Sequence, residues 1–209
     1  LAMLARTVPR LGLRNVARVA FYRLRLKLGW RPRPLGHECP AGALFDCSFE
    51  GDVGGVATLK VFGWHEVSTS SPPDWYADYI GDGPRLNPDQ DWSEALLSLG
   101  GGDAKRYWEL SRFYWLPQLA LAAKTGDRKA AATIEYWLRD WIDKNPPFRG
   151  INWACAQESA IRLMNLALTA LILDRWCNPS PAMQWLVETH AHRVYPTLSY
   201  AIGQDNNHG

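Results

Sequence analysis

The stretch RKAAATIEYWLRDWIDK, residues 128–144, decides the fold class, because its apolar residues recur at the spacing of one helix face. The opposite face is charged, and this two-sided pattern is typical of a helix that packs on a protein core. Asp127 precedes the stretch as a side-chain N-cap, and Pro146 and Pro147 follow it as a stop. We therefore expect one regular helix with these limits. Its apolar face consists of Ala131, Ile134, Trp137, Leu138, Trp141 and Ile142, and its charged face of Glu135, Arg139, Asp140 and Asp143.

Three more helices are expected on either side of this one, at residues 104–124, 153–176 and 181–202. Pro117 lies inside the first of them and predicts a bend or a break there. The connections between the helices are short, and Gly126 is typical of a helix C-terminus. Short connections favour antiparallel neighbours, so the fold class that we expect is all-α, built from helical hairpins.

The first 80 residues are expected to form an irregular extension, followed by the helical part at residues 81–209. A short helix is predicted at residues 15–28, where apolar and basic residues interleave. This helix could pack on the body with a solvated basic side, or it could bind a membrane surface or a partner. Residues 31–40 contain three prolines and cannot be regular, whereas residues 58–67 alternate enough for one or two strands.

The composition is that of a globular chain with one domain, or one domain and an extension: 209 residues, a net charge of +2 and 47% hydrophobic residues. The near balance of charge argues against a strongly basic nucleic-acid-binding protein, and no apolar run reaches the length of a membrane span. The 11 tryptophans indicate a large core or a surface that stacks on flat ligands such as sugars. No cysteine has metal-binding spacing, so we expect free thiols, no metal and no cofactor. The four cysteines are Cys39, Cys47, Cys155 and Cys177.

A polar stripe runs along the otherwise apolar helix predicted at residues 153–176. The stripe contains Glu158, Arg162, Asn165 and Thr169. One interpretation is a buried Glu158–Arg162 ion pair at i, i+4 spacing that holds helices together, and the other is a stripe that lines a cavity. For Arg162 we favour the ion pair. Glu109 and Arg112, one helix earlier, allow the same two interpretations.

Three segments of the helical part form a distinctive combination. They are WELSRFYWLPQLALAAKTGD at residues 108–127, WLRDWIDKNPPFRGINWACAQESAIRLMN at residues 137–165 and DNNHG at residues 205–209. The pattern NPP-x-x-G-x-NW, followed by a helix with E-x-x-x-R and then by NNHG, is fairly specific. Together the segments resemble the heparinase II/III-type polysaccharide lyases, in particular the branch from bacterial exopolysaccharide and lipopolysaccharide gene clusters. The resemblance covers residues 64–209, and the first sixty residues match only loosely.

This resemblance implies an incomplete α/α toroid of helical hairpins followed by an antiparallel β-sandwich. The chain would hold only the N-terminal part of the toroid, and the β-sandwich of the same full-length protein would be a partner outside it. The implied reaction is β-elimination on an anionic polysaccharide that contains uronic acid, with no cofactor and no nucleic acid. A signal peptide is not visible, whereas the resemblance implies a periplasmic or secreted protein.

The resemblance also implies the catalytic residues. Asn207 and His208 match the Asn-His pair that neutralises the uronate carboxylate and so stabilises an enolate-like state. Depending on the substrate stereochemistry, His208 could instead serve as the base. The family's catalytic Tyr and a second catalytic His would lie outside this chain, because Tyr195 and Tyr200 do not match the position of that Tyr.

Substrate contacts are expected near the turn into the helix at residues 153–176. The candidates are Asn152, Trp153 and Gln157, with Asn206 as a weaker one from the last segment. Trp108 and Trp115 could form a platform on which sugars stack, or they could belong to the core.

Two other functions stay open on the sequence alone. A glycoside hydrolase on an α/α toroid needs two carboxylates across a cleft, and Glu109 and Glu158 are the candidates. Each is followed by an arginine three or four residues later, which favours a structural role. The other alternative is a non-catalytic sugar-binding or assembly protein of an envelope polysaccharide pathway.

Overall fold

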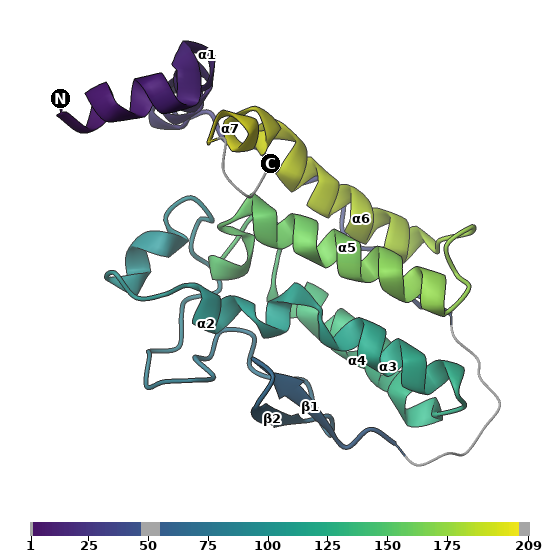
Figure 1. The fold of residues 1–209 in the computed structure, drawn as a ribbon. Coiled ribbons are helices and arrows are strands. Elements are labelled where there is room, and N and C mark those ends of the chain that lie inside the picture. The colour runs from purple at the N-terminus through teal and green to yellow at the C-terminus, as the bar shows by residue number, and fades with distance from the viewer. Residues whose placement is uncertain (1, 47–54, 205–209) are drawn as a thin grey trace.

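Helices make up most of the structure, a computed structural model that describes residues 2–46 and 55–204, with side chains from residue 12 onward (Figure 1). The α-helices are α1 (Ala2–Lys27), α2 (Lys105–Trp108), α3 (Trp115–Lys124), α4 (Arg128–Lys144), α5 (Ala156–Ile172), α6 (Pro181–Val194) and α7 (Leu198–Gln204). Short 3-10 helices are η1 (Ala95–Leu99), η2 (Leu110–Arg112), η3 (Ile151–Trp153) and η4 (Tyr195–Thr197). The expected predominance of helix is confirmed. Within the described ranges, no helix is both long and apolar enough to cross a membrane.

The four longest helices of the second half lie side by side (Figure 1). Helix α3 packs against both α4 and α5, and α5 packs against α6. Helix α1 contacts α7 at one end of this group. The strands β1 (Thr58–Val61) and β2 (His65–Ser68) form an antiparallel hairpin with Leu59 opposite Val67, as the alternation at residues 58–67 predicts. The helices therefore pack in the order α4, α3, α5 and α6, so α5 packs on α3 and not mainly on α4, which precedes it in the sequence.

Helix α4 has the limits that the sequence predicts. The Asp127 side chain caps it, since Oδ1 accepts a hydrogen bond from the Ala130 N–H at 2.9 Å. At the other end, the Asn145 side chain donates to the Trp141 carbonyl at 2.8 Å, and two prolines prevent a further turn. The predicted apolar face is buried in the core.

The helix predicted at residues 104–124 is interrupted earlier than expected. Its residues form α2, η2 and α3, and the break lies at Phe113, whose backbone is left-handed with φ 66°. Pro117 does not cause the break. It lies in the first turn of α3, where backbone N–H groups have no partner within the helix and a proline costs little.

Three other predicted helices differ from the structure at their ends. Helix α5 begins at Ala156, after η3, and ends at Ile172 instead of extending to residue 176. The helix predicted at residues 181–202 is divided into α6, η4 and α7, and Pro196 lies at the division. Helix α1 begins well before residue 15 and contains a non-helical residue, Gly12, with φ 77°.

Most of the tryptophans belong to the core. Trp115 and Trp137 meet edge to face with ring centroids 5.1 Å apart, and Phe113 meets Trp141 at 4.9 Å. Trp108 and Trp115 are buried, and their indole N–H groups donate to the Ile151 and Leu110 carbonyls. These contacts assign both to the core and not to a sugar-stacking platform. Eight of the 11 tryptophans are buried: Trp75, Trp92, Trp108, Trp115, Trp137, Trp141, Trp153 and Trp185.

Residues 37–46 run along the helices as an irregular strap held by side chains. The Glu135 carboxylate on α4 accepts from the backbone N–H groups of Leu44 and Phe45 at 2.7 and 2.6 Å. On α6, the Trp185 indole donates to the His37 carbonyl at 2.9 Å. Leu44 and Phe45 lie in the same apolar core as the helices, so the described part of residues 1–80 shares its core with residues 81–209. Because it shares that core, the strap belongs to the helical body.

Candidate functional site

The three candidates from the last segment, Asn206, Asn207 and His208, lie outside the described residues. Helix α7 leads into them and ends at Gln204, where the described chain stops. Their role in binding a uronate carboxylate stays a prediction.

The pattern NPP-x-x-G-x-NW folds into a hydrogen-bonded loop between α4 and α5. The Asn152 side chain donates to Asn145 Oδ1 at 2.8 Å and to the Trp75 carbonyl at 3.0 Å. The Trp153 indole donates to the Asn145 carbonyl at 3.0 Å. Gly150 makes the turn with φ 67°, ψ 179°, a backbone conformation that is close to glycine-only. The pattern is thus explained by folding.

This loop corrects two of the expected substrate contacts. Asn152 and Trp153 are 0% and 1% exposed, and their donor groups are bonded inside the protein. Neither side chain can therefore touch a polysaccharide in this structure. Gln157, in the first turn of α5, is exposed, and its contact with substrate stays a prediction.

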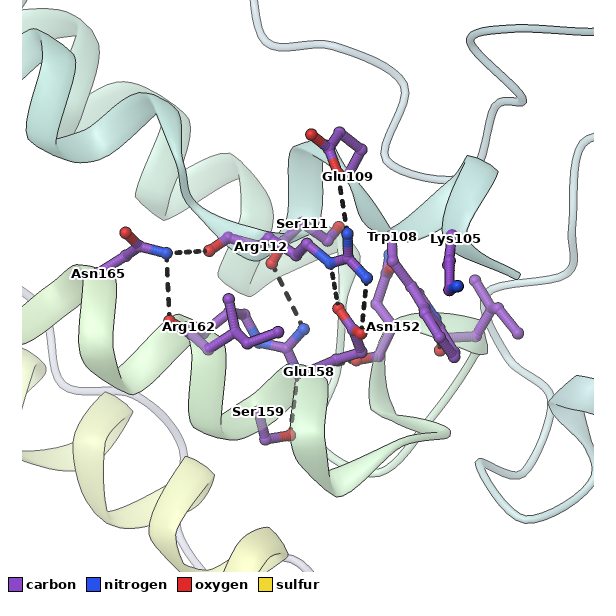
Figure 2. A network of polar contacts seen from close by, with 12 residues as sticks. Lys105, Trp108, Glu109, Ser111, Arg112, Asn152, Glu158, Ser159, Arg162 and Asn165 are labelled. Carbon is purple, nitrogen blue, oxygen red and sulfur yellow. Dashed lines mark hydrogen bonds and ion pairs between the residues drawn. The ribbon is translucent and has the colours of Figure 1, made fainter. Parts of the chain in front are cut away.

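The expected ion pairs are present with one exchange of partner (Figure 2). Arg112 and Glu158 form a two-point pair, with Nε to Oε2 at 2.7 Å and Nη2 to Oε1 at 2.9 Å. The same guanidinium binds Glu109 at 2.9 Å, as the spacing of these two residues suggests. The predicted Glu158–Arg162 pair is wrong, because the Glu158 carboxylate turns to η2 while the Arg162 guanidinium turns to α6.

Arg162 is fully buried and is held mainly by uncharged groups. Its Nε donates to His190 Nε2 at 2.8 Å, and its Nη2 donates to the Asn152 carbonyl at 2.8 Å and to Ser159 Oγ at 3.0 Å. Desolvation lowers the pKa of Arg162 to about 9, which still leaves the guanidinium charged at neutral pH. The group therefore joins α5 to α6 and to the loop before α5, and it has no access to a ligand.

A second buried arginine, Arg193 on α6, binds the same loop. Its Nε and Nη2 donate to the carbonyls of Trp153 and Ala154, both at 2.9 Å. The guanidinium lies 3.9 Å from the centre of the Trp92 ring, and burial lowers its pKa to about 10. Arg162 and Arg193 together hold the residues just before the N-terminus of α5, because both guanidinium groups bind backbone carbonyls there.

The stability of this buried cluster is expected to depend on pH through His190. Burial, reinforced by the Arg162 charge, lowers the pKa of His190 well below its ordinary value of 6.5. The unfolded chain therefore takes up a proton near pH 6.5 and the folded chain does not. As the pH falls from about 7 to about 5, the free energy of unfolding should decrease by up to about 1.4 kcal/mol per pH unit. Urea denaturation at a series of pH values measures this slope.

His190→Gln tests whether His190 causes this dependence of unfolding free energy on pH, and His65→Gln is the control variant. A glutamine at 190 can accept from Arg162 without titrating, so this variant should lose the histidine part of the slope. His65 is half-buried at the start of β2, so His65→Gln shows what the loss of a histidine outside this cluster does to stability. Equal slopes in wild type and His190→Gln would contradict a neutral buried His190.

A cleft of about 650 Å³ in the described surface combines aromatic rings with arginines. It lies between the segment after α1, the residues before η1 and the loop between α4 and α5. The aromatic rings are those of Trp30, Trp92 and Phe148, and the arginines are Arg31, Arg33 and Arg149. Sequence reasoning missed this cleft, although the run WRPRP at residues 30–34 already combines an aromatic residue, two cations and two prolines.

The walls of the cleft are fixed by backbone contacts between distant segments. Trp92 N–H donates to the Phe148 carbonyl at 3.3 Å, and Gly150 N–H donates to the Gln90 carbonyl at 2.7 Å. Phe148 also meets the His192 ring of α6 at 6.2 Å. The cleft therefore lies near His192, in the last turn of α6.

Arginines outnumber carboxylates among the residues that line the cleft. Arg31 pairs with Asp91 at 3.3 Å, and the Arg149 guanidinium donates to the Asp89 carbonyl at 2.9 Å. Among the described residues, Arg33 and Arg149 have no carboxylate partner. Trp92 and Phe148 are each 4% exposed, so the groups that a ligand can reach are the arginines and the half-buried Trp30, and these suit a ligand that carries carboxylates.

The described residues contain no group of three or more metal-binding side chains. Comparisons with models of protein families, with curated proteins and with solved structures found no match for this chain.

Proposed function

We propose that the chain is the N-terminal part of a polysaccharide lyase that cleaves a uronic-acid-containing polysaccharide by β-elimination. The observation that carries the proposal is the cleft, in which Arg33 and Arg149, without a carboxylate partner among the described residues, lie in one opening with the half-buried Trp30 ring. The sequence resemblance of the DNNHG segment and the packed helical hairpins support it. The hairpins would form part of an incomplete α/α toroid, completed outside this chain.

The chemistry assigns a role to each part of the site. A base removes the proton at C5 of the uronate, the C5–H electrons form the C4=C5 double bond, and the C4–O4 bond breaks. An acid then protonates the departing O4. Negative charge builds on the uronate carboxylate, and donors from Asn207 and His208 would stabilise it as an oxyanion hole does. Asn206 and Gln157 would contact the neighbouring sugar, and Arg33 and Arg149 would bind further carboxylates along the polymer.

The glycoside hydrolase alternative loses its candidate residues. Glu109 and Glu158 both bind the single guanidinium of Arg112, so this cation lies between them in place of a substrate bond. A hydrolase also needs two carboxyl groups that both reach the sugar, and here both are engaged in ion pairs with Arg112. The remaining alternative is a non-catalytic protein that binds a sugar polymer in the cleft.

The test is an ultraviolet assay of the full-length gene product on a panel of uronate polymers, heparan-like, alginate-like and bacterial. Each elimination leaves an unsaturated uronate that absorbs in the ultraviolet, so absorbance should rise. Asn207→Ala and His208→Ala should each lower kcat by roughly 10²- to 10³-fold, the usual cost of losing one oxyanion donor. The 209-residue chain alone should be inactive, because the acid and its partners lie outside it.

Controls separate the lyase from a sugar-binding protein. Asn178→Ala, at an exposed asparagine between α5 and α6, should leave the rate unchanged. Arg33→Gln should raise KM more than it lowers kcat, because a cleft cation contacts the polymer away from the reacting bond. If the protein binds a polymer but absorbance does not rise, the lyase proposal is wrong and the non-catalytic sugar-binding function is favoured. Turnover by the 209-residue chain would contradict the proposed division of the site.

A further inference from the structure

Helix α1 presents an apolar stripe to solvent. Leu13 and Leu28 are each 76% exposed, and Phe21 and Leu24 are more than half exposed. Leu28 continues the helical geometry, since its N–H donates to the Leu24 carbonyl at 2.9 Å. Together with the exposed Ala17, these residues are spaced by three or four, so they lie on one face of the helix over about four turns.

The other face of α1 is the one that packs on the protein. The rings of Tyr22 and Tyr200 lie 4.6 Å apart, and α7 is in contact with α1 along its length. The backbone of Gly203 comes so close that an added Cβ would lie 2.9 Å from Cβ of Arg18 and 3.2 Å from Val19. Because the buried face is already filled by α7, the apolar stripe does not serve the packing of the described structure.

Cations border the stripe on both sides. By helical spacing, Arg14 lies next to one edge and Arg23 and Lys27 next to the other, and all three are exposed. Residues 1–37 contain nine Lys and Arg and no Asp or Glu, out of 23 basic and 21 acidic residues in the chain. The other residues therefore hold 14 basic and 21 acidic residues, a net charge of −7 against +9. The basic charge is concentrated in the segment that carries the exposed stripe.

We infer that the stripe of α1 binds the surface of an anionic lipid bilayer. A helix with an apolar face and cationic borders lies in the interface with its apolar side among the acyl chains and its cations at the headgroups. An anionic polymer would attract the cations but gives no reason for exposed leucines and a phenylalanine. A second copy of the chain would bring two strongly cationic helices together. This inference stands apart from the proposed lyase function.

The geometry gives the bound protein an orientation. Helix α1 lies at the edge of the molecule beside α7 (Figure 1). The cleft begins at Gly29 and Trp30, directly after the helix, so it would open close to the membrane surface.

The test is flotation of the full-length gene product with vesicles. Vesicles of phosphatidylcholine mixed with an equal amount of phosphatidylglycerol should carry the protein upward, and vesicles of phosphatidylcholine alone should carry much less. The pair Leu13→Glu and Leu28→Glu should lower the partition coefficient on the order of a hundredfold, since two exposed leucines no longer enter the bilayer. The pair Arg23→Gln and Lys27→Gln should lower it about fivefold per charge removed.

The matched control replaces two exposed leucines outside α1 with glutamate, so it adds the same negative charge away from the stripe. Leu97 and Leu121 are 79% and 58% exposed outside α1, so Leu97→Glu with Leu121→Glu should bind vesicles as wild type does. Near-ultraviolet circular dichroism establishes that each variant is folded. Equal binding by the α1 pair and the control pair would overturn the inference, as would an absence of binding to the anionic vesicles. A lipid-free dimer that only the α1 substitutions dissociate would assign the stripe to a second copy instead.

Discussion

Replacing Arg162 with methionine is expected to lower the free energy of unfolding by about 3 kcal/mol or more. Methionine keeps most of the apolar stem, but it leaves His190 Nε2, the Asn152 carbonyl and Ser159 Oγ without their donor. Each buried acceptor that loses its partner costs about 1 to 3 kcal/mol, which relief of guanidinium desolvation offsets only in part. For a chain of this size the melting temperature should fall by roughly 6 to 12 °C.

Arg85→Met is the matched control for this loss. The Arg85 side chain is 58% exposed and pairs with Asp74 at the surface at 2.7 Å, so its replacement should change stability by less than about 1 kcal/mol. Arg162→Lys should lose most of what Arg162→Met loses, because one ammonium cannot reach acceptors arranged around a guanidinium. Urea denaturation of all three variants measures the differences. A stable Arg162→Met protein would contradict the structural role of this residue.

Gly150→Ala is expected to destabilise the protein by about 2 to 5 kcal/mol. With φ 67° and ψ 179°, the backbone at Gly150 lies where an L side chain is strained. The added Cβ would also meet the Tyr76 hydroxyl at 2.7 Å, its ring at 2.8 Å and the Pro88 carbonyl at 3.0 Å. Tyr76 is buried and the Pro88 contact is backbone, so the neighbours cannot move aside cheaply.

Two other glycines separate the strain from the clash. Gly100 has φ 55° with open space around it, so Gly100→Ala should show the strain alone, about 1 kcal/mol. Gly36 has neither a positive φ nor a close neighbour, so Gly36→Ala should lie within about 0.5 kcal/mol of wild type. Thermal denaturation ranks the three. A Gly150→Ala protein no less stable than Gly100→Ala would show that the close approach is absent.

The parts of the fold that follow from local chemistry could be predicted from the sequence. Helix α4 has its predicted ends because an aspartate cap and two prolines act on their immediate neighbours. The break before α3 could not be predicted, since Phe113 takes a left-handed conformation in order to bury its ring against Trp141. Pro196 was a usable signal for the division between α6 and α7, as prolines within a helical pattern often mark its end.

The site could be predicted less well, because it depends on contacts between distant segments. The i, i+4 spacing permits a Glu158–Arg162 pair, but the fold brings Arg112 to Glu158 from a different element. Asn152 and Trp153 lie in a distinctive motif, yet a motif does not distinguish a side chain that meets a ligand from one that closes a loop. The cleft joins three segments that are far apart in the sequence, and no local pattern reports that they meet.

The strap at residues 37–46 cannot reach its final folded contacts until later parts of the chain have been synthesised. Its partners lie far downstream: Ser180 binds the Leu44 carbonyl across 136 residues, and Trp185 binds the His37 carbonyl across 148 residues. At translation rates of about 5 to 20 residues per second, the strap leaves the ribosome roughly 7 to 30 s before these partners exist. The strap is thus completely fixed only after Ser180 and Trp185 have been made. Until then, Leu44 and Phe45, which are buried in the folded protein, lack part of the contacts that cover them.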